Sequence, residues 1–284
     1  MRREKARSSS LMLRFVVAVA PEADALVRRY RMELQEGAFR WYRSEAAALV
    51  ISGVGKTAAA AAAGYLHAKT GEEPLGVWLN FGTAGHRDRP RGDLVLAHTV
   101  RDAASGESFH PTLLDGPELE AVEIRTVERP EVAFDSDAVY DMEASGFVAT
   151  AIRFSTSELV QSIKIVSDNR GTTTAAWTPE AVRDLVEERA DDVAGAAERF
   201  REIARDLEPL RRAETETKAL VGAFRGRARF TTSEARRLAR LLVRWAALEP
   251  GAVLRPEIIP GASSAEILDG LERRLRNAAA ERSL

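Results

Sequence analysis

Short apolar runs that end in acidic or glycine-rich turns alternate with helical segments along much of the 284-residue chain. Phe15–Ala20 is followed by Pro21 and Glu22, and Gly76–Asn80 is followed by a turn that contains glycine. The Ala-rich stretch Thr57–Lys69 between these two runs has the composition of a helix. Strands that alternate with helices are typical of an α/β sheet whose strands are at least partly parallel. The pattern therefore predicts an α/β fold.

The other expected elements continue this alternation. Further strands are expected at Phe39–Tyr42, Ala46–Ile51, Asp93–Val100, Ala138–Tyr140 and Leu159–Val166. Further helices are expected at Glu22–Tyr30, Met142–Phe154 and Thr178–Leu207, with a loop at Phe81–Arg91. Polar groups at the carboxyl ends of strands gather in one crevice of an open α/β sheet. Four such groups are expected to converge there: Glu22, Ser52–Lys56, Asn80–Gly85 and Ser167–Asp168.

The composition excludes several classes of site. The chain has no cysteine, which excludes disulfides, thiolate metal sites and a cysteine nucleophile. Its 4 histidines lack the HExxH spacing, so we expect no metal site. No apolar run reaches the roughly 18 residues of a membrane span. Arg14 leaves only Phe15–Ala20 as an apolar run after the basic start, so we favour a buried strand over a signal peptide and expect a cytoplasmic protein.

Charge divides the chain into three expected parts: a basic lead-in at 1–12, a main domain at 13–208 and a helical appendage at 209–284. The appendage has 15 Lys and Arg residues against 9 Asp and Glu residues, and the capping boxes Thr231-x-x-Glu234 and Ser263-x-x-Glu266 each open a helix in it. Residues 211–244 have 10 basic and 3 acidic side chains with interleaved aromatic residues, which is one pattern of nucleic-acid binding. We favour instead an amphipathic helical pair whose Leu238, Leu241 and Leu242 pack on the main domain.

Six short motifs occur in a fixed order in the main domain. They are VAPE at 19–22, SGVGK at 52–56, NFGTAG at 80–85, GD at 92–93, DME at 141–143 and KIVSD at 164–168. With this set the chain resembles the purine nucleoside phosphorylase / 5'-methylthioadenosine–S-adenosylhomocysteine nucleosidase superfamily over about residues 14–205. The resemblance implies a three-layer mixed sheet flanked by helices, and cleavage of the N-glycosidic bond of a purine nucleoside or a 5'-modified adenosine.

The resemblance also implies a role for each site residue. Glu22 matches the glutamate that deprotonates the attacking water, and Asp168 matches the aspartate that protonates purine N7. Glu143, together with Met142, matches the residues that bind ribose. The turn beside the nucleophile or phosphate is matched by Gly53, Gly55, Thr83, Gly85 and Lys164, and Ser167 is placed to orient Asp168. These roles suit the chemistry, because a purine leaves poorly unless it is protonated and the ribosyl group becomes cationic in the transition state.

Hydrolysis and phosphorolysis both fit this set of residues. Glycine amides and basic side chains can bind phosphate, and the candidates are Gly53, Gly55, Lys56, Thr83, His86, Arg87 and Lys164. A carboxylate such as Glu22 beside the nucleophile suits water and repels phosphate, so we favour hydrolysis. Inorganic phosphate would be the only co-substrate of a phosphorylase, and no metal or redox cofactor is expected. The family forms homo-oligomers, which we therefore expect here.

Other interpretations of the same residues remain open. Glu22 suits the first turn of any helix, and Asp168 suits a helix N-cap. Ser52–Lys56 resembles the end of a P-loop, but Val50 stands where the first glycine is needed. A nucleoside-binding protein without catalysis would have the same fold. The purine-stacking residue of the nucleosidases has no clear match, and the candidates are Phe109, Phe134 and Phe147. Lys164 stands where the hydrolases often have arginine.

Overall fold

The computed structural model describes residues 11–114, 117–171, 178–248, 254, 256–261 and 263–281. The chain divides into two compact units between Asp206 and Leu207. Most of the expected basic lead-in lies outside the described residues, as does the Thr-rich segment 172–177 that follows the last strand of the first unit.

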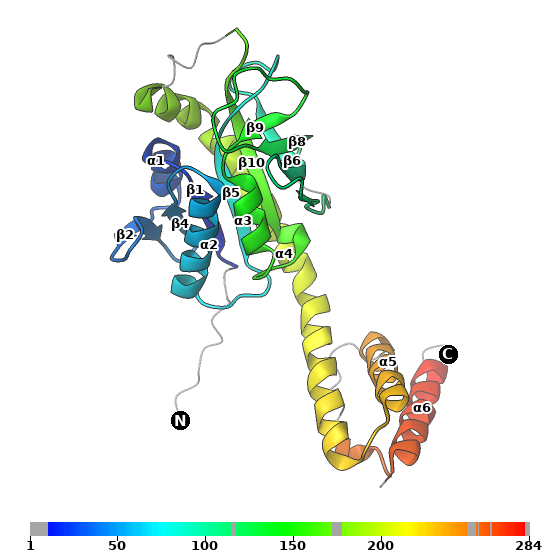
Figure 1. Cartoon of the computed structure of the whole chain (residues 1–284). Helices are drawn as coiled ribbons and strands as arrows, with labels where there is room; N and C mark the ends of the chain where they lie inside the picture. Colours follow the sequence, from blue (N-terminus) through cyan, green and yellow to red (C-terminus); the bar gives the residue numbers. More distant parts are fainter. Residues whose placement is uncertain are drawn as a thin grey trace. The chain divides into compact units, whose positions relative to one another are not determined.

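The first unit contains a 10-stranded mixed sheet with helices on both faces (Figure 1). Its strands are β1 Leu13–Val17, β2 Glu33–Gln35, β3 Trp41–Arg43, β4 Ala47–Ile51, β5 Val77–Gly85, β6 Leu94–Asp102, β7 Ser108–Phe109, β8 Glu120–Thr126, β9 Val139–Asp141 and β10 Val160–Asp168. Its helical elements are α1 Ala20–Arg29, α2 Lys56–Thr70, α3 Ala144–Ala151, the short 3-10 turn Ser157–Leu159 and the first part of α4 Pro179–Arg227.

The strand order is β10-β6-β8-β9-β5-β1-β4-β3-β2, with β7 paired to β6. Because β10 also pairs with β5, the strands β5, β10, β6, β8 and β9 close into a ring. β1 is parallel to β4 and to β5, and β5 is parallel to β10. The carboxyl ends of these four strands therefore lie at one edge of the sheet, where Asp168 pairs in register with Gly85.

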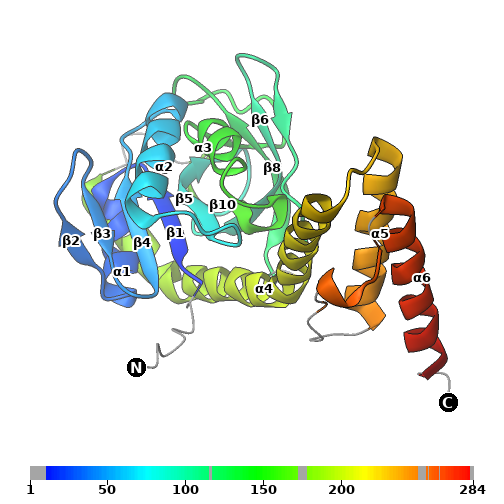
Figure 2. The ribbon, with the colours of Figure 1, turned by 90° about the horizontal axis from the view of Figure 1, so that it is seen from below.

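Helices α2 and α3 lie side by side over one face of the sheet, and α1 and α4 lie over the other (Figures 1 and 2). The fully buried side chains of Phe15, Phe81 and Phe147 come from both the sheet and the helices. Ion pairs join α1 to α4 at Arg183–Asp24, 3.0 Å, and at Arg28–Glu187. The predicted three-layer α/β fold is confirmed.

Several element boundaries differ from the prediction, and the helix predicted at Met142–Phe154 is limited to α3, Ala144–Ala151. β1 ends at Val17 and α1 begins at Ala20, because Pro21 fits the first turn of a helix. The loop predicted at Phe81–Arg91 is wrong in its first half, since β5 continues to Gly85 alongside β10. Helix α4 does not end near Leu207 but continues to Arg227 with Pro209 inside it.

The second unit consists of the end of α4, α5 Thr232–Leu248, the short 3-10 helix Pro256–Ile258 and α6 Ser264–Glu281. Both predicted capping boxes form: the Thr231 amide donates to Glu234 Oε2 at 2.8 Å, and the Ser263 amide donates to Glu266 Oε2 at 3.1 Å. Leu238, Leu241 and Leu242 belong to this unit's own core and not, as predicted, to a contact with the main domain. No described helix is long and apolar enough to cross a membrane.

Candidate active site

A cavity of about 360 Å³ lies at the carboxyl ends of the parallel strands. Its wall comprises Ala18, Val19, Glu22, Val54, Thr83, Ala84, Gly85, Val127, Pro130, Glu131, Tyr140, Asp141, Met142, Glu143, Ser167 and Asp168. Seven of the residues predicted from the sequence are among them: Glu22, Thr83, Gly85, Met142, Glu143, Ser167 and Asp168. Gly53, Gly55 and Lys164 lie outside the wall.

Glu22 is buried at the start of α1, with 3% of its surface exposed. Its Oε2 accepts hydrogen bonds from the amides of Ala18 and Val19, at 3.0 and 3.2 Å. Its Oε1 accepts from the amide and the hydroxyl of Thr83, at 2.8 and 2.9 Å. Four donors therefore fix the orientation of this carboxylate.

Asp168 is the last residue of β10 and pairs in register with Gly85 of β5. Its Oδ1 accepts a hydrogen bond of 2.6 Å from the Ser167 hydroxyl. A Cβ at position 85 would lie 2.9 Å from Asp168 Oδ2 and 2.7 Å from the ring of Phe134. Only glycine at this position therefore leaves room for the carboxylate and the aromatic ring together.

Glu143 precedes α3 and is 6% exposed. Its Oε1 accepts a hydrogen bond of 2.8 Å from the Gly55 amide. Burial raises the pKa of Glu143, and Asp141 acts in the same direction while Lys164 opposes it. The site thus holds this carboxylate in surroundings that disfavour its negative charge.

Lys164 is the buried counter-ion of this part of the site. Its ammonium pairs with Asp141 Oδ2 at 2.8 Å, and only 1% of its side chain is exposed. Burial alone would lower the pKa of Lys164, but Asp141 and Glu143 outweigh that effect and raise it. Lys164 was predicted to contact the incoming nucleophile. In the structure it does not line the cavity, and its ammonium instead balances the charge of Asp141.

The Ser52–Lys56 turn supports Glu143. Gly53 and Gly55 have φ angles of 82° and 107°, which suit glycine, and the Gly55 amide is used by Glu143. Lys56 pairs with Asp102 at 2.7 Å and with Glu128 at 2.6 Å. Since the amide and the lysine both have carboxylate partners, the geometry argues against the P-loop alternative.

The aromatic candidates lie apart from one another. Phe147 is fully buried in α3, and Phe109 on β7 packs on the same core cluster. Phe134 contacts Gly85 from behind the wall and packs edge-on against Tyr140, with ring centroids 5.8 Å apart. Tyr140 itself lines the cavity and was missed, because it stands at the end of a weakly patterned segment.

Two acidic wall residues, Glu131 and Asp141, were also not predicted as site residues. With Glu22, Glu143 and Asp168 they give the cavity a wall with five carboxyl groups. Among the described residues of the wall there is no Lys, Arg or His. His86 lies behind the wall, and its Nδ1 accepts from the amides of Asp88 and Arg89. Such a wall disfavours an anionic ligand and favours cationic charge that develops inside it.

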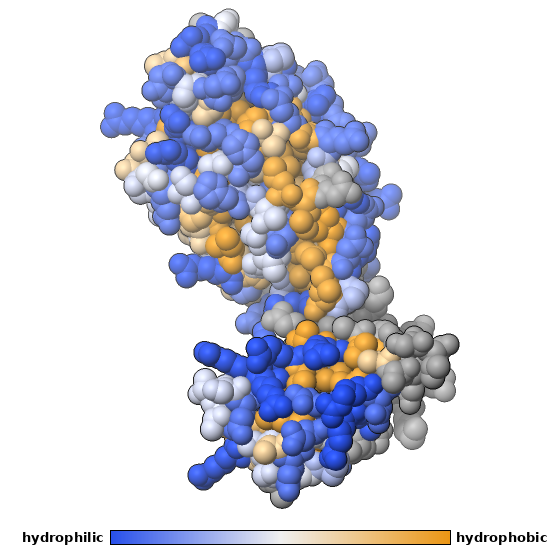
Figure 3. Space-filling view, turned by 90° about the vertical axis from the view of Figure 1, so that its right-hand side faces the viewer, coloured by the Kyte–Doolittle hydropathy of each residue, from blue (hydrophilic) through white to orange (hydrophobic). Residues whose placement is uncertain are grey.

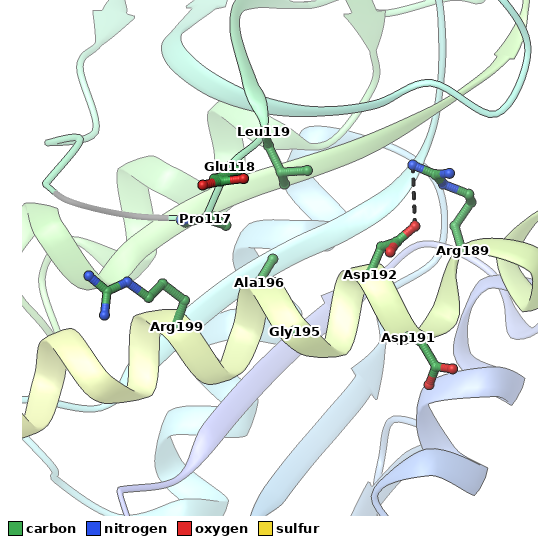
Figure 4. Close-up of a pocket in the computed structure, with 9 residues that line it drawn as sticks. All are labelled: Pro117, Glu118, Leu119, Arg189, Asp191, Asp192, Gly195, Ala196 and Arg199. Atoms are coloured by element: carbon green, nitrogen blue, oxygen red, sulfur yellow. Dashed lines mark ion pairs between the residues drawn. The ribbon is translucent and has the colours of Figure 1, made fainter.

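A larger hollow of about 820 Å³ lies between residues 117–119 and α4 (Figure 4). Its charged side chains include the ion pair Arg189–Asp192, at 3.3 Å. It contains none of the predicted site residues, so the smaller cavity is the better candidate. In the described part of the chain, no group of three or more His, Asp or Glu side chains is arranged to hold a metal ion.

No protein-family model and no curated protein matches the chain. Solved structures do match. A 5'-methylthioadenosine nucleosidase from Arabidopsis thaliana is 15% identical with a TM-score of 0.54, over 68% of this chain and 95% of its own. The 5'-methylthioadenosine/S-adenosylhomocysteine nucleosidase from S. pneumoniae, solved with a transition-state inhibitor, is 18% identical with a TM-score of 0.53, over 66% of this chain and 99% of its own. The chain has the fold of these nucleosidases.

A third nucleosidase, from Colwellia psychrerythraea 34H in complex with adenine, is 18% identical with a TM-score of 0.52. It is matched over 69% of this chain and 96% of its own. The nucleosidase fold therefore accounts for about two thirds of the residues and leaves about a third of the chain unmatched.

Proposed function

We propose that the first unit hydrolyses the N-glycosidic bond of a purine nucleoside or a 5'-modified adenosine. The observation that carries this proposal is the cavity wall, which unites Glu22, Glu143 and Asp168 without a described cationic side chain. These three groups supply a base, a ribose ligand and an acid, which are the parts that the cleavage needs.

Asp168 is the proposed acid. It protonates N7 of the purine as the bond to ribose breaks, so the base leaves as a neutral molecule. The Ser167 hydroxyl, 2.6 Å from Oδ1, holds one oxygen and leaves Oδ2 beside Gly85 to carry the proton. Tyr140, against which Phe134 packs edge-on, gives this end of the cavity an aromatic side chain that suits a flat base.

Glu22 is the proposed base. Its carboxylate is fixed by the amides of Ala18, Val19 and Thr83, which prevents rotation away from the cavity. A water molecule that donates to it and also contacts the Thr83 hydroxyl is activated as its proton passes to Glu22. Attack at the ribose carbon then completes the hydrolysis.

Glu143 and Met142 are the proposed ribose ligands. Glu143 accepts hydrogen bonds from the ribose hydroxyls, while Met142 contacts the apolar face of the sugar. The carboxylates of Glu22, Asp141 and Glu143 also stabilise the positive charge of the ribosyl group in the transition state. The buried ammonium of Lys164 beside them forms an ion pair with Asp141.

Phosphorolysis is the less favoured alternative. A phosphate dianion would have to enter a wall with five carboxyl groups, and the lysine of the Gly-rich turn has carboxylate partners. Water has no such cost. A nucleoside-binding protein without catalysis is the second alternative, and it is favoured because no phenylalanine is among the described residues of the cavity wall.

Chromatographic detection of free base tests these possibilities. Adenosine, methylthioadenosine, S-adenosylhomocysteine, 5'-deoxyadenosine, inosine and guanosine would each be incubated with and without phosphate. Base released without phosphate supports hydrolysis, whereas release that requires phosphate and yields ribose 1-phosphate makes the protein a phosphorylase. Binding of a nucleoside without release, even at high protein concentration, supports the second alternative.

We further propose that the protein acts in the cytoplasm, as a homo-oligomer and without a metal or redox cofactor. Large exposed apolar side chains of the first unit include Leu113, Leu114 and Val132, and apolar surface forms a band on one face of this unit (Figure 3). Such a surface suits contact between subunits. Sedimentation of the full chain would measure its oligomeric state.

A further inference from the structure

One face of α5 in the second unit carries three arginines four residues apart: Arg236, Arg240 and Arg244. Side chains at this spacing lie on the same side of a helix, with a rise of roughly 6 Å between neighbours. All three are exposed, and none takes part in a hydrogen bond or ion pair with another described residue. We call these three residues the arginine ladder.

Two carboxylates close to α5 have partners at its contact with α6. Glu234 accepts from Thr231 and from the Ser264 hydroxyl, at 2.8 and 2.9 Å, and so faces the start of α6. Arg237, the neighbour of Arg236, pairs with Glu272 of α6 at 2.8 Å. Glu234 and Glu272 therefore have their partners at the contact between α5 and α6, and no carboxylate among the described residues forms an ion pair with the ladder.

From this separation of charge we infer that the arginine ladder binds the phosphate backbone of a nucleic-acid duplex. Guanidinium groups bind phosphate oxygens through two parallel hydrogen bonds, and a row of them fits a polymer with regularly spaced anions. This inference concerns the second unit and is independent of the function proposed for the first.

Two features of the second unit favour a duplex over other polyanions. The aromatic side chains of Phe224 and Trp245 are in the core, with 0% and 7% exposed, and Phe230 is only partly exposed, so they offer little surface on which unpaired bases stack. The apolar face of α5 is also in the core, and Val243 is its one large exposed apolar side chain among the described residues. A helix that binds a membrane surface needs a broad free apolar face, which α5 lacks.

Fluorescence anisotropy with a short labelled DNA duplex tests the inference on the full chain. The ladder variant is R236Q/R240Q/R244Q. The matched control is R225Q/R273Q/R276Q, which removes the same charge from exposed arginines of the same unit outside the ladder. Glutamine has nearly the helix propensity of arginine, so both variants should show the circular dichroism and the melting temperature of the unchanged protein.

We expect the unchanged chain to bind the duplex at low salt and the ladder variant to bind on the order of a hundredfold more weakly. Plotted as log affinity against log salt concentration, the slope should be shallower by about 2.7 in the ladder variant, since each lost phosphate contact contributes about 0.9. The control should keep most of the affinity. Equal losses in both variants, or no binding by the unchanged chain, would overturn the inference. So would ladder-dependent binding to vesicles with anionic lipid in the absence of duplex binding.

Discussion

The hydroxyl of Ser167 donates a hydrogen bond of 2.6 Å to Oδ1 of its neighbour Asp168. This bond defines which oxygen of the carboxyl group is held by the protein and which one is left for the substrate. The two residues close the parallel strand β10 at the edge of the sheet where the other strand ends also lie. The relationship makes the role of each residue testable separately.

The substitution Asp168→Asn should remove most base release while the protein stays folded. An amide has no acidic proton for purine N7, and loss of a general acid costs about 10²- to 10⁴-fold in rate. The measurement is initial rate by chromatography, with the melting temperature as the check on folding. Ser167→Ala keeps the carboxylic acid of Asp168 but removes the hydrogen bond that orients it. This variant should therefore reduce the rate less than Asp168→Asn does. A folded Asp168→Asn variant with near-normal turnover would exclude Asp168 as the acid.

The substitution Glu22→Gln should lower kcat far more than it changes KM. An amide cannot take a proton from water, but its oxygen can still accept hydrogen bonds from the Thr83 amide and hydroxyl. Its NH2 group meets the donor amides of Ala18 and Val19, so the free energy of unfolding should also fall by roughly 1–3 kcal/mol. Steady-state kinetics and urea unfolding measure the two effects. Parallel changes in kcat and KM would contradict a role for Glu22 as the base.

The residues found from the sequence stand where local signals are strong. Glu22, Glu143 and Asp168 each lie at the boundary of an apolar strand or helix, and their roles came from the resemblance of six ordered motifs to the nucleoside phosphorylase/nucleosidase superfamily. Tyr140 and Glu131 were missed because they belong to the stretch that closes the ring of strands, whose pairing depends on residues distant in sequence. Lys164 was assigned to the nucleophile because its charge is visible in the sequence, whereas its burial against Asp141 is not.

Pro209 shows a different limit of prediction from sequence. Proline usually ends a helix, yet α4 passes through Pro209 and continues to Arg227, beyond the predicted end near Leu207. The boundary between the two compact units falls close to this proline, between Asp206 and Leu207. The local rule failed because the residues after Pro209 pack in the core of the second unit, where Phe224 is fully buried.

The substitution Gly85→Ala should reduce activity at least tenfold, because its Cβ would lie 2.7 Å from the Phe134 ring and 2.9 Å from Asp168 Oδ2. Overpacking of this kind also costs about 1–3 kcal/mol of stability. Gly64→Ala in α2 is the matched control, since nothing lies within 4 Å of its Cβ. That control should keep full activity and gain roughly 0.5–1 kcal/mol of stability. Kinetics and thermal unfolding of both variants test this. Unchanged activity in Gly85→Ala would show that activity does not depend on the close packing of Asp168 and Phe134 against Gly85.

The substitution Glu143→Gln should stabilise the protein at neutral pH while it weakens substrate binding. Burial raises the pKa of Glu143 above its ordinary value of 4.5, so ionisation of this group costs folding free energy. Below about pH 4.5 the carboxyl group is protonated in both states, and the substitution should change the stability little. As pH rises above that value, the unfolded state ionises first and the unchanged protein loses stability that the glutamine variant keeps.

Urea unfolding of both proteins at a series of pH values from acid to neutral measures this divergence. The glutamine oxygen can still accept from the Gly55 amide, which limits the structural change. Glu118→Gln is the control, because Glu118 is exposed and its substitution should have no effect at any pH. If Glu143→Gln is instead the less stable protein at neutral pH, attraction to Lys164 outweighs burial, and the ionised carboxylate is a net source of stability. If Glu143→Gln is more stable at neutral pH and also has a raised KM, the buried charge of Glu143 lowers the stability of the fold but contributes to ribose binding.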